Sequence, residues 1–186
     1  MTDSLSPDNG RATRIEEIES FSGDDLPQLC DLAHDAIIDG EGFLWVRPPP
    51  QRILENYWNG VVLVPERSLW IARLDGRIVG TVQILNPSVN NESGAFAAQI
   101  TTLIVAGHAR RLGLARGLLR QAEAMAISRG FTALDLDVRA DREAAIRLFE
   151  AEGYKRWGVK PRYARIQGRY ISGYYFSKFL DTDGTP

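Results

Sequence analysis

Apolar and polar residues follow a helical spacing in some parts of the first half of the chain and a strand-like spacing in others. Apolar residues recur every three or four positions between Asp24 and Gly40, which predicts an amphipathic helix with Asp24 or Asp25 near its N-cap. Two β-rich runs flank Asp75-Gly76, a pair typical of a hairpin turn. The expected elements are a strand over 14–20, a helix over 24–40, a proline loop ending at 48–50, a helix over 51–64 and a hairpin over 68–86.

The second half of the chain alternates between strand-like and helical segments. We expect a strand over 96–105, a helix over 112–129, a strand over 131–138, a helix over 141–151 and two aromatic-rich strands in the tail. A hairpin followed by this order predicts the α/β (α+β) class: a single-domain mixed, mostly antiparallel twisted sheet of about six or seven strands, with helices on both faces. The domain is expected over 14–180, between flexible termini at 1–13 and 181–186.

Composition narrows the classes of function. A chain of 186 residues, 44% of them hydrophobic, can bury one substantial core, and its formal net charge of −2 gives no overall field for nucleic acid. Cys30 is the lone cysteine and there are two histidines, so we expect neither a disulfide framework nor a metal site. No run approaches the roughly 20 apolar residues of a membrane span. A cytoplasmic protein without membrane or nucleic-acid partners is expected, and the arginines and tyrosines of the tail are interpreted as a solvated hairpin.

The stretch "IVAGHARRLGLARGLL", residues 104–119, raises the first candidate for chemistry. An apolar strand breaks into glycine and arginine and then resumes as a helix, whose first N–H groups and dipole suit an anion such as phosphate. Gly113 would let an anion approach the backbone, and Arg110, Arg111 and Arg116 could add charge-assisted contacts. The alternative is that Gly107 merely ends the strand and the arginines are solvated surface charges.

These residues resemble a known family. Residues 110–115, "RRLGLA", fit the R/Q-x-x-G-x-G/A signature of the GCN5-related N-acetyltransferases (GNAT), after a strand "ITTLIV" and at the start of a helix. The resemblance continues through "FTALDLDV" and "AAIRLFEAEGY" and covers most of the chain from about Arg14 to Leu180. The segments "GFLWVRPPP" and "VKPRYARIQGRY" resemble, less specifically, the branch that contains tabtoxin-resistance acetyltransferases.

The resemblance implies acetyl-CoA as co-substrate, without a metal. In the family, the strand before the motif carries a bulge and splays from its neighbour, and its freed backbone groups pair with pantetheine while the next turn surrounds the pyrophosphate. Bulges do leave backbone groups unpaired. The implied cofactor-binding residues are Leu103, Val105, Arg110, Arg111, Leu112, Gly113, Leu114, Ala115, Arg116 and Phe149.

The implied reaction is direct attack of a neutral amine on the thioester, which needs a group that accepts a proton and a group that protonates the leaving thiolate. Two positions depart from the common family pattern. Gln99 stands where many members have a glutamate base, and Phe149 stands where many have a tyrosine acid. The alternative to an enzyme is therefore a catalytically weak acyl-CoA-binding sensor or interaction module.

Asp137 is the remaining candidate base. In "LDLDV" the alternation of strand residues places Asp135 and Asp137 on one face, where carboxylates cost desolvation free energy unless they are paired, hydrated or used. Asp137 could equally cap a helix or pair with Arg139 or Arg142. Tyr163 is a candidate proton donor or a packed loop residue. Gln99 and Trp45 are candidates for binding a small amine or amino-acid-like acceptor, and edge strands in the tail could form a homodimer.

Overall fold

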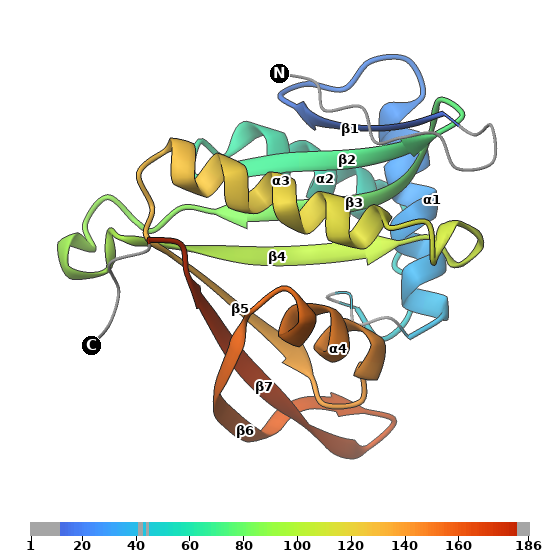
Figure 1. Cartoon of the computed structure of the whole chain (residues 1–186). Coiled ribbons are helices and arrows are strands. Elements are labelled where there is room, and N and C mark those ends of the chain that lie inside the picture. Colours follow the sequence, from blue (N-terminus) through green and yellow to red (C-terminus); the bar gives the residue numbers. More distant parts are fainter. Residues whose placement is uncertain (1–11, 41–42, 44, 182–186) are drawn as a thin grey trace.

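The computed structural model describes residues 12–40, 43 and 45–181. Its strands form one sheet in the order β1-β2-β3-β4-β5-β7-β6, in which only β4 and β5 pair in parallel (Figure 1). This confirms the predicted mixed, mostly antiparallel sheet. The strands are β1 (Thr13–Ile18), β2 (Arg67–Leu74), β3 (Arg77–Leu85), β4 (Ala97–Val105), β5 (Ala133–Arg139), β6 (Lys155–Ile166) and β7 (Arg169–Phe179).

Helices cover both faces of the sheet, as predicted. α1 (Asp25–Ile38) and α2 (Gln51–Leu63) lie on one face, and α3 (Leu114–Ser128) and α4 (Glu143–Ala151) lie on the other (Figure 1). Each face has its own buried cluster: Trp58 and Leu29 belong to the first, and Leu118 and Phe176 to the second. Two short 3-10 turns, η1 (Glu92–Gly94) and η2 (Gly107–Ala109), flank β4.

The hairpin between β2 and β3 forms where the turn sequence predicts it. Asp75 and Gly76 have φ angles of 51° and 83°, the left-handed pair that a tight hairpin turn of matching twist requires. The first helix differs in one detail, because the side chain of Asp24 makes no cap hydrogen bond. Asp25 instead accepts hydrogen bonds from the backbone N–H of Ser22 and from Arg73.

Several boundaries differ from the sequence-based expectation; for example, β5 begins at Ala133 rather than at 131, and α4 begins at Glu143 rather than at 141. α3 begins at Leu114 rather than at Leu112, because Arg111 and Gly113 adopt left-handed φ angles of 64° and 75° that a helix cannot contain. β1 begins at Thr13, one residue before the expected domain boundary. The flexibility expected at the two ends falls mainly on 1–11 and 182–186, which lie outside the described residues.

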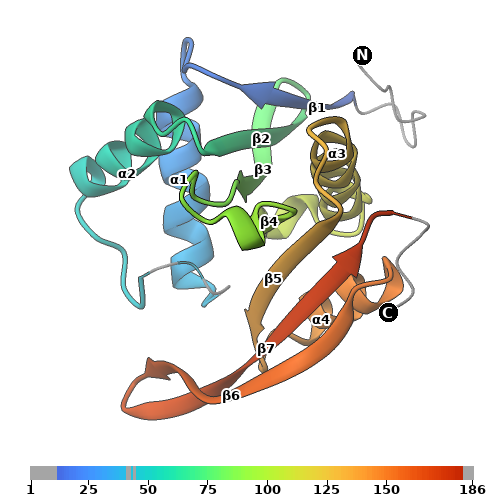
Figure 2. The same ribbon diagram turned by 90° about the vertical axis from the view of Figure 1, so that its left-hand side faces the viewer.

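The sheet opens between β4 and β5. The two strands pair only where Ala97–Gln99 meets Ala133–Asp135, and from Ile100 onwards β4 has no partner on that side. Beyond this point β4 stays with β3, whereas β5 stays with β7. Figure 2 shows the β5-β7-β6 part of the sheet turned away from the β1-β4 part, so the two halves form a V.

Candidate active site

A cavity of about 520 Å³ fills the V. Residues 100–104 of β4 line one wall and residues 136–139 of β5 line the other, while residues 143–145 of α4 and the ring of Phe43 complete it. Because the β4 backbone here has no β5 partner, its polar groups on that side are open to a ligand that lies along the strand. The cavity therefore combines an extended row of backbone groups with side chains from three other segments.

A β-bulge lies in β4 at the mouth of the V. Pairing with β3 runs from Thr81 with Ile104 to Gln83 with Thr101, so β4 carries one extra residue between these pairs. Thr102 within the bulge has a left-handed φ of 53°. Both the bulge and the splay that the resemblance implied are present. Of the two residues expected to hold pantetheine, Leu103 lines the cavity, and Val105 pairs with Gly80 at the end of the strand.

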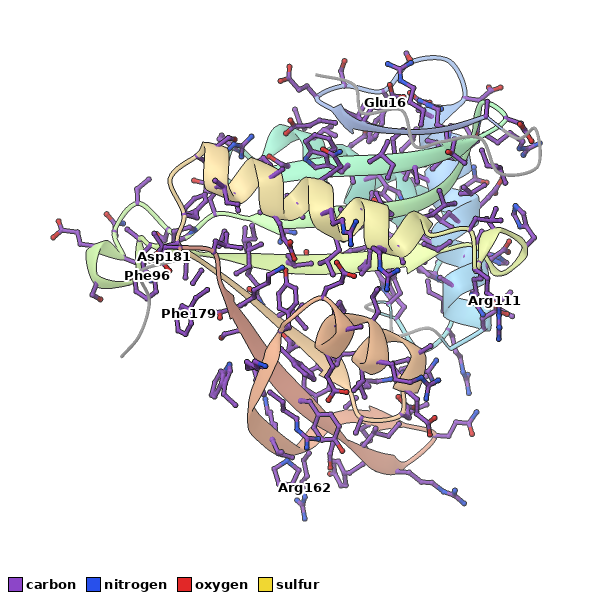
Figure 3. The ribbon with its side chains drawn as sticks, in the orientation of Figure 1. Glu16, Phe96, Arg111, Arg162, Phe179 and Asp181 are labelled. Carbon is purple, nitrogen blue, oxygen red and sulfur yellow. The ribbon has the colours of Figure 1, made fainter. Side chains whose placement is uncertain are left out.

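The glycine–arginine turn lies next to the end of β4, and Arg111 is at its outer side in Figure 3. Gly113, with its φ of 75°, immediately precedes the first residue of α3. The N–H groups of the first helical turn, from Leu114 to Arg116, have no carbonyl partner within the helix. This geometry suits an anion, and it puts the turn beside the open backbone of β4.

The three arginines of the motif have different surroundings. Arg116 donates to Glu152 over 2.6 Å, and Arg110 lies 3.7 Å from Asp39. Arg111 is exposed and makes no ion pair with any residue that the structure describes. Burial alone would raise the pKa of Glu152, but hydrogen bonds and charge from Arg120 and Arg116 outweigh it and leave that pKa below its usual value.

Three of the candidate acceptor-side residues are in contact: Asp137 and Tyr163 line the cavity, and Gln99 contacts Asp137 from β4. Gln99 Nε2 donates to Asp137 Oδ1 over 3.2 Å, and the Tyr163 hydroxyl donates to Asp137 Oδ2. Each carboxylate oxygen therefore receives one hydrogen bond. Burial, followed by the hydrogen bond to Asp137 and its charge, raises the pKa of Tyr163 well above its ordinary value. The phenol of Tyr163 therefore keeps its proton at neutral pH.

The alternatives for Asp137 are a helix cap and an ion pair with Arg139 or Arg142. The N-cap of α4 is Arg142, so Asp137 does not cap that helix. Both arginines instead pair with Asp141, each over 3.0 Å. The other strand carboxylate, Asp135, receives a hydrogen bond from Ser177. Asp137 is therefore the carboxylate that lines the cavity beside the tyrosine.

A distortion of β6 brings Tyr163 to Asp137. Pairing with β7 shifts from Lys160 with Gly173 to Ala164 with Ile171, so β6 carries two extra residues between these pairs. The Tyr163 ring then lies across the backbone of Gly173, where an added Cβ would come within 2.7 Å of the tyrosine Cβ. No sequence signal in β6 predicts that the Tyr163 ring lies across β7, because this placement depends on Gly173, ten residues away.

Comparison with known proteins agrees with this geometry. The family model described as Acetyltransferase (GNAT) family matches residues 28–154. The chain belongs to the GNAT family of acetyltransferases. An uncharacterized N-acetyltransferase from the hisH-hisA intergenic region of Azospirillum brasilense is 50% identical over 125 residues, which are 67% of this chain and 74% of that protein.

Solved GNAT structures share the fold at low identity. An N-acetyltransferase from Staphylococcus aureus has a TM-score of 0.78 at 17% identity, covering 91% of this chain and 99% of its own. A putative acetyltransferase, yncA, from Salmonella typhimurium, solved with acetyl-CoA, has a TM-score of 0.76 at 15% identity, covering 94% and 97%. The finer resemblance to tabtoxin-resistance acetyltransferases stays a prediction.

Two remaining site predictions within this GNAT chain concern aromatic residues. Phe149 is buried at the inner end of the cavity, packed against Tyr154 and Phe176. Trp45 stacks on Phe43 at 5.5 Å between ring centroids, and it is the Phe43 ring that lines the cavity. The aromatic residues of this loop suggest a wall for the acceptor. Only the fold shows that Phe43 lines the cavity and that Trp45 lies behind it.

Sequence reasoning missed several polar residues of the cavity wall, among them Thr101, Thr102, Asp141 and Glu143. Thr101 lines the cavity, and its hydroxyl oxygen is buried without a hydrogen-bond partner among the described residues. A threonine in a strand gives no signal of this kind, because strands are rich in threonine for steric reasons. The cavity wall next to Gln99 therefore carries a hydroxyl that a bound ligand could engage.

The other expectations concern regions away from the cavity. Arg162 and Arg165 lie over the ring of Tyr170 in the β6–β7 hairpin, whose outer end carries Arg162 in Figure 3. Within the described part of the chain, no three His, Cys, Asp or Glu side chains gather as a metal site. Nor does that part contain a helix long and apolar enough to cross a membrane.

Proposed function

We propose that this GNAT protein transfers the acetyl group of acetyl-CoA to the amine of a small molecule, by direct attack while both substrates are bound. The observation that carries the proposal is the V between β4 and β5, with open backbone on one wall and the Asp137–Tyr163 pair on the other. Acetyl-CoA supplies an activated thioester when it is bound. The β4 backbone near Leu103 and the first turn of α3 after Gly113 are suited to hold its pantetheine and pyrophosphate.

On the acceptor side we assign Asp137 to accept a proton from the ammonium form of the amine. Tyr163 is assigned to supply a proton to the departing thiolate, because its hydroxyl lies in the cavity and contacts Asp137. Its raised pKa keeps the phenol protonated but does not make it a stronger acid, so the assignment rests on geometry. Gln99 cannot accept a proton at neutral pH, and its hydrogen bond orients the Asp137 carboxylate. In this proposal Asp137 of β5 takes the role of base that many family members assign to the residue at position 99 of β4.

A covalent route through the lone cysteine is not supported. Cys30 is buried in α1, and burial together with the charges of Glu55 and Asp31 raises its pKa to about 11. A thiol with this pKa is rarely ionised at neutral pH and is a poor nucleophile. Direct attack by the amine needs no such group.

The cavity volume supports a small acceptor. Sites for small molecules commonly measure about 300–1,000 Å³, and the cavity of about 520 Å³ must also receive the acetyl end of the donor. An amine or an amino-acid-like molecule fits this space. Among proteins of the same fold are a phosphinothricin acetyltransferase from Sinorhizobium meliloti and a spermidine N-acetyltransferase chimera from Vibrio cholerae and hSSAT, which are named for substrates of this kind.

Calorimetric titration with acetyl-CoA, followed by turnover across a panel of amines with detection of free CoA, tests this function. We expect binding and turnover, and we expect Asp137→Asn to lower kcat by about 100-fold or more while acetyl-CoA still binds. A folded protein that binds no acetyl-CoA would refute the proposal. Full activity in Asp137→Asn would refute only the assignment of the base.

A second candidate function has a specific observation behind it. Gln99 and Phe149 replace the usual base and acid of the family, which is what an acyl-CoA sensor that had lost catalysis would show. Tight acetyl-CoA binding without turnover of any amine in the same panel would favour the sensor.

A further inference from the structure

A chain of polar contacts connects the far side of the sheet to the β4 bulge. Arg67 Nη1 donates to Gln83 Oε1 over 2.9 Å, and Gln83 Nε2 donates to the hydroxyl of Tyr57 over 2.9 Å. The same hydroxyl lies 3.4 Å from Thr102 Oγ1. Gln83 is fully buried, so its amide depends on these partners.

The directions of the first two contacts follow from their chemistry. Arg67 can only donate, so it fixes the Gln83 oxygen as acceptor and the Gln83 amide nitrogen as donor to Tyr57. In the contact between Tyr57 and Thr102, either hydroxyl can donate. The tyrosine hydroxyl therefore connects a buried amide to the bulge.

Thr102 needs an external contact more than its neighbours do. A left-handed φ of 53° is unfavourable for a β-branched residue, and such conformations persist where surrounding structure holds them. The bulge at Thr102 also lies in the part of β4 that no longer pairs with β5, since that pairing ends at Gln99. A contact that holds Thr102 thus holds the open backbone of the donor half-site.

The ring of Tyr57 contacts the acceptor side of the same cavity. Its edge meets Phe43, with ring centroids 5.5 Å apart, and Trp45, with centroids 5.6 Å apart. Phe43 in turn lines the cavity. One residue of α2 therefore touches the bulge through its hydroxyl and the aromatic acceptor wall through its ring.

We propose that Tyr57 is a positioning residue for both half-sites: its hydroxyl holds the β4 bulge in the shape that binds acetyl-CoA, and its ring holds the Phe43 wall that faces the acceptor. The inference rests on the proposed function. It extends that function by assigning the geometry of the site to a residue of α2 that does not line the cavity itself.

The first test separates the two contacts. Tyr57→Phe keeps the ring and removes the hydroxyl, so we expect the acetyl-CoA Kd, measured by calorimetry, to rise about three- to ten-fold, the worth of one hydrogen bond. The KM of the best amine in the panel is expected to stay within about two-fold. Phe43→Leu is expected to show the opposite pattern, and Tyr170→Phe, on the β6–β7 hairpin, serves as the control without effect on either constant.

A double-mutant cycle tests the specific partner. Thr102→Ala removes the hydroxyl that contacts Tyr57, so its effect on the acetyl-CoA Kd and that of Tyr57→Phe are not expected to add in the double variant. If Tyr57→Phe folds poorly, the acetyl-CoA Kd of Thr102→Ala alone still tests whether the contact supports donor binding. Unchanged acetyl-CoA Kd in both single variants, with normal binding by the wild type, would overturn the inference alone. Absence of binding by the wild type would overturn the proposed function and this inference together.

Discussion

At the scale of single residues, the acid–base pair depends on a residue that carries no functional group. Tyr163 reaches Asp137 by lying across the backbone of Gly173, where there is no room for a Cβ beneath its ring. We expect Gly173→Ala to displace the tyrosine and to lower kcat at least as far as Tyr163→Phe does, by about 10-fold or more. Steady-state turnover of the best amine measures the effect.

Gly158→Ala is the matched control for this prediction. Gly158 lies in the same hairpin, but an added Cβ would meet Tyr175 at 3.6 Å, an ordinary contact. It should therefore leave kcat close to the wild-type value. Equal losses in both variants would show that the hairpin tolerates no alanine, and a fully active Gly173→Ala would contradict the role of the glycine.

The same residues show what a sequence can and cannot reveal. Alternation in "LDLDV" makes both Asp135 and Asp137 candidates, because two carboxylates on an apolar strand need a reason, and Asp137 is preferred for its place nearer the carboxyl end. Its contact with Tyr163 could not be predicted, since it depends on two extra residues in β6 and on Gly173. Local pattern identifies candidate groups, and the register of distant strands decides which of them meet.

At the scale of elements, the start of α3 is the feature most sensitive to one substitution. Gly113 has a φ of 75° at the N-cap, which costs an alanine roughly 1 kcal/mol. Gly113→Ala should lower thermal stability and also weaken acetyl-CoA binding, because the helix N-terminus would shift relative to β4. Thermal unfolding and calorimetric titration measure the two effects.

Gly130, at the other end of α3, provides the comparison. It has a similar φ of 82°, and no atom lies within 4 Å of an added Cβ at either glycine. The helix of 15 residues separates them by about 20 Å. Gly130→Ala should lose similar stability but keep the wild-type acetyl-CoA Kd, and a matching loss of affinity would show that the turn at Gly113 has no special part in binding.

Element order was predictable, whereas distortions within elements were not. The Asp75-Gly76 turn and the spacing in α1 have short-range causes, so both appeared where expected. The bulge at Thr102 was implied only by the resemblance to the family, because a threonine in a strand carries no signal for a left-handed φ. The late start of α3 was also not predictable from local pattern, because Leu112 suits a helix but lies between two residues with left-handed φ angles.

At the scale of the whole molecule, a charged cluster joins three elements on the side of the sheet away from the V. Arg73 of β2 donates to Asp25 of α1 and to Glu16 of β1, each over 2.7 Å. The side chains of Asp25 and Arg73 are only 6% and 19% exposed. Loss of Asp25 would remove one of the two carboxylates that Arg73 contacts and leave Glu16 as its partner, so the cluster contributes to global stability.

Asp25→Asn should therefore lower the free energy of unfolding by about 2 kcal/mol at pH 7, the worth of its charge-assisted hydrogen bonds. Burial alone would raise the pKa of Asp25, but hydrogen bonds from Arg73 and Ser22 outweigh it and leave the pKa below its ordinary 3.8. A lowered folded-state pKa gives stability that is present above pH 3.8 and is lost as the pH falls through the folded value. Urea unfolding of the wild type and of Asp25→Asn at pH 7, 5 and 3 measures the difference between their free energies of unfolding. This difference should become smaller only at pH 3.

Glu17→Gln is the control, because Glu17 forms a more exposed pair with Arg129. It should lower the free energy of unfolding by less than about 1 kcal/mol. A difference between wild type and Asp25→Asn that stays constant to pH 3 would contradict the ionic role of Asp25.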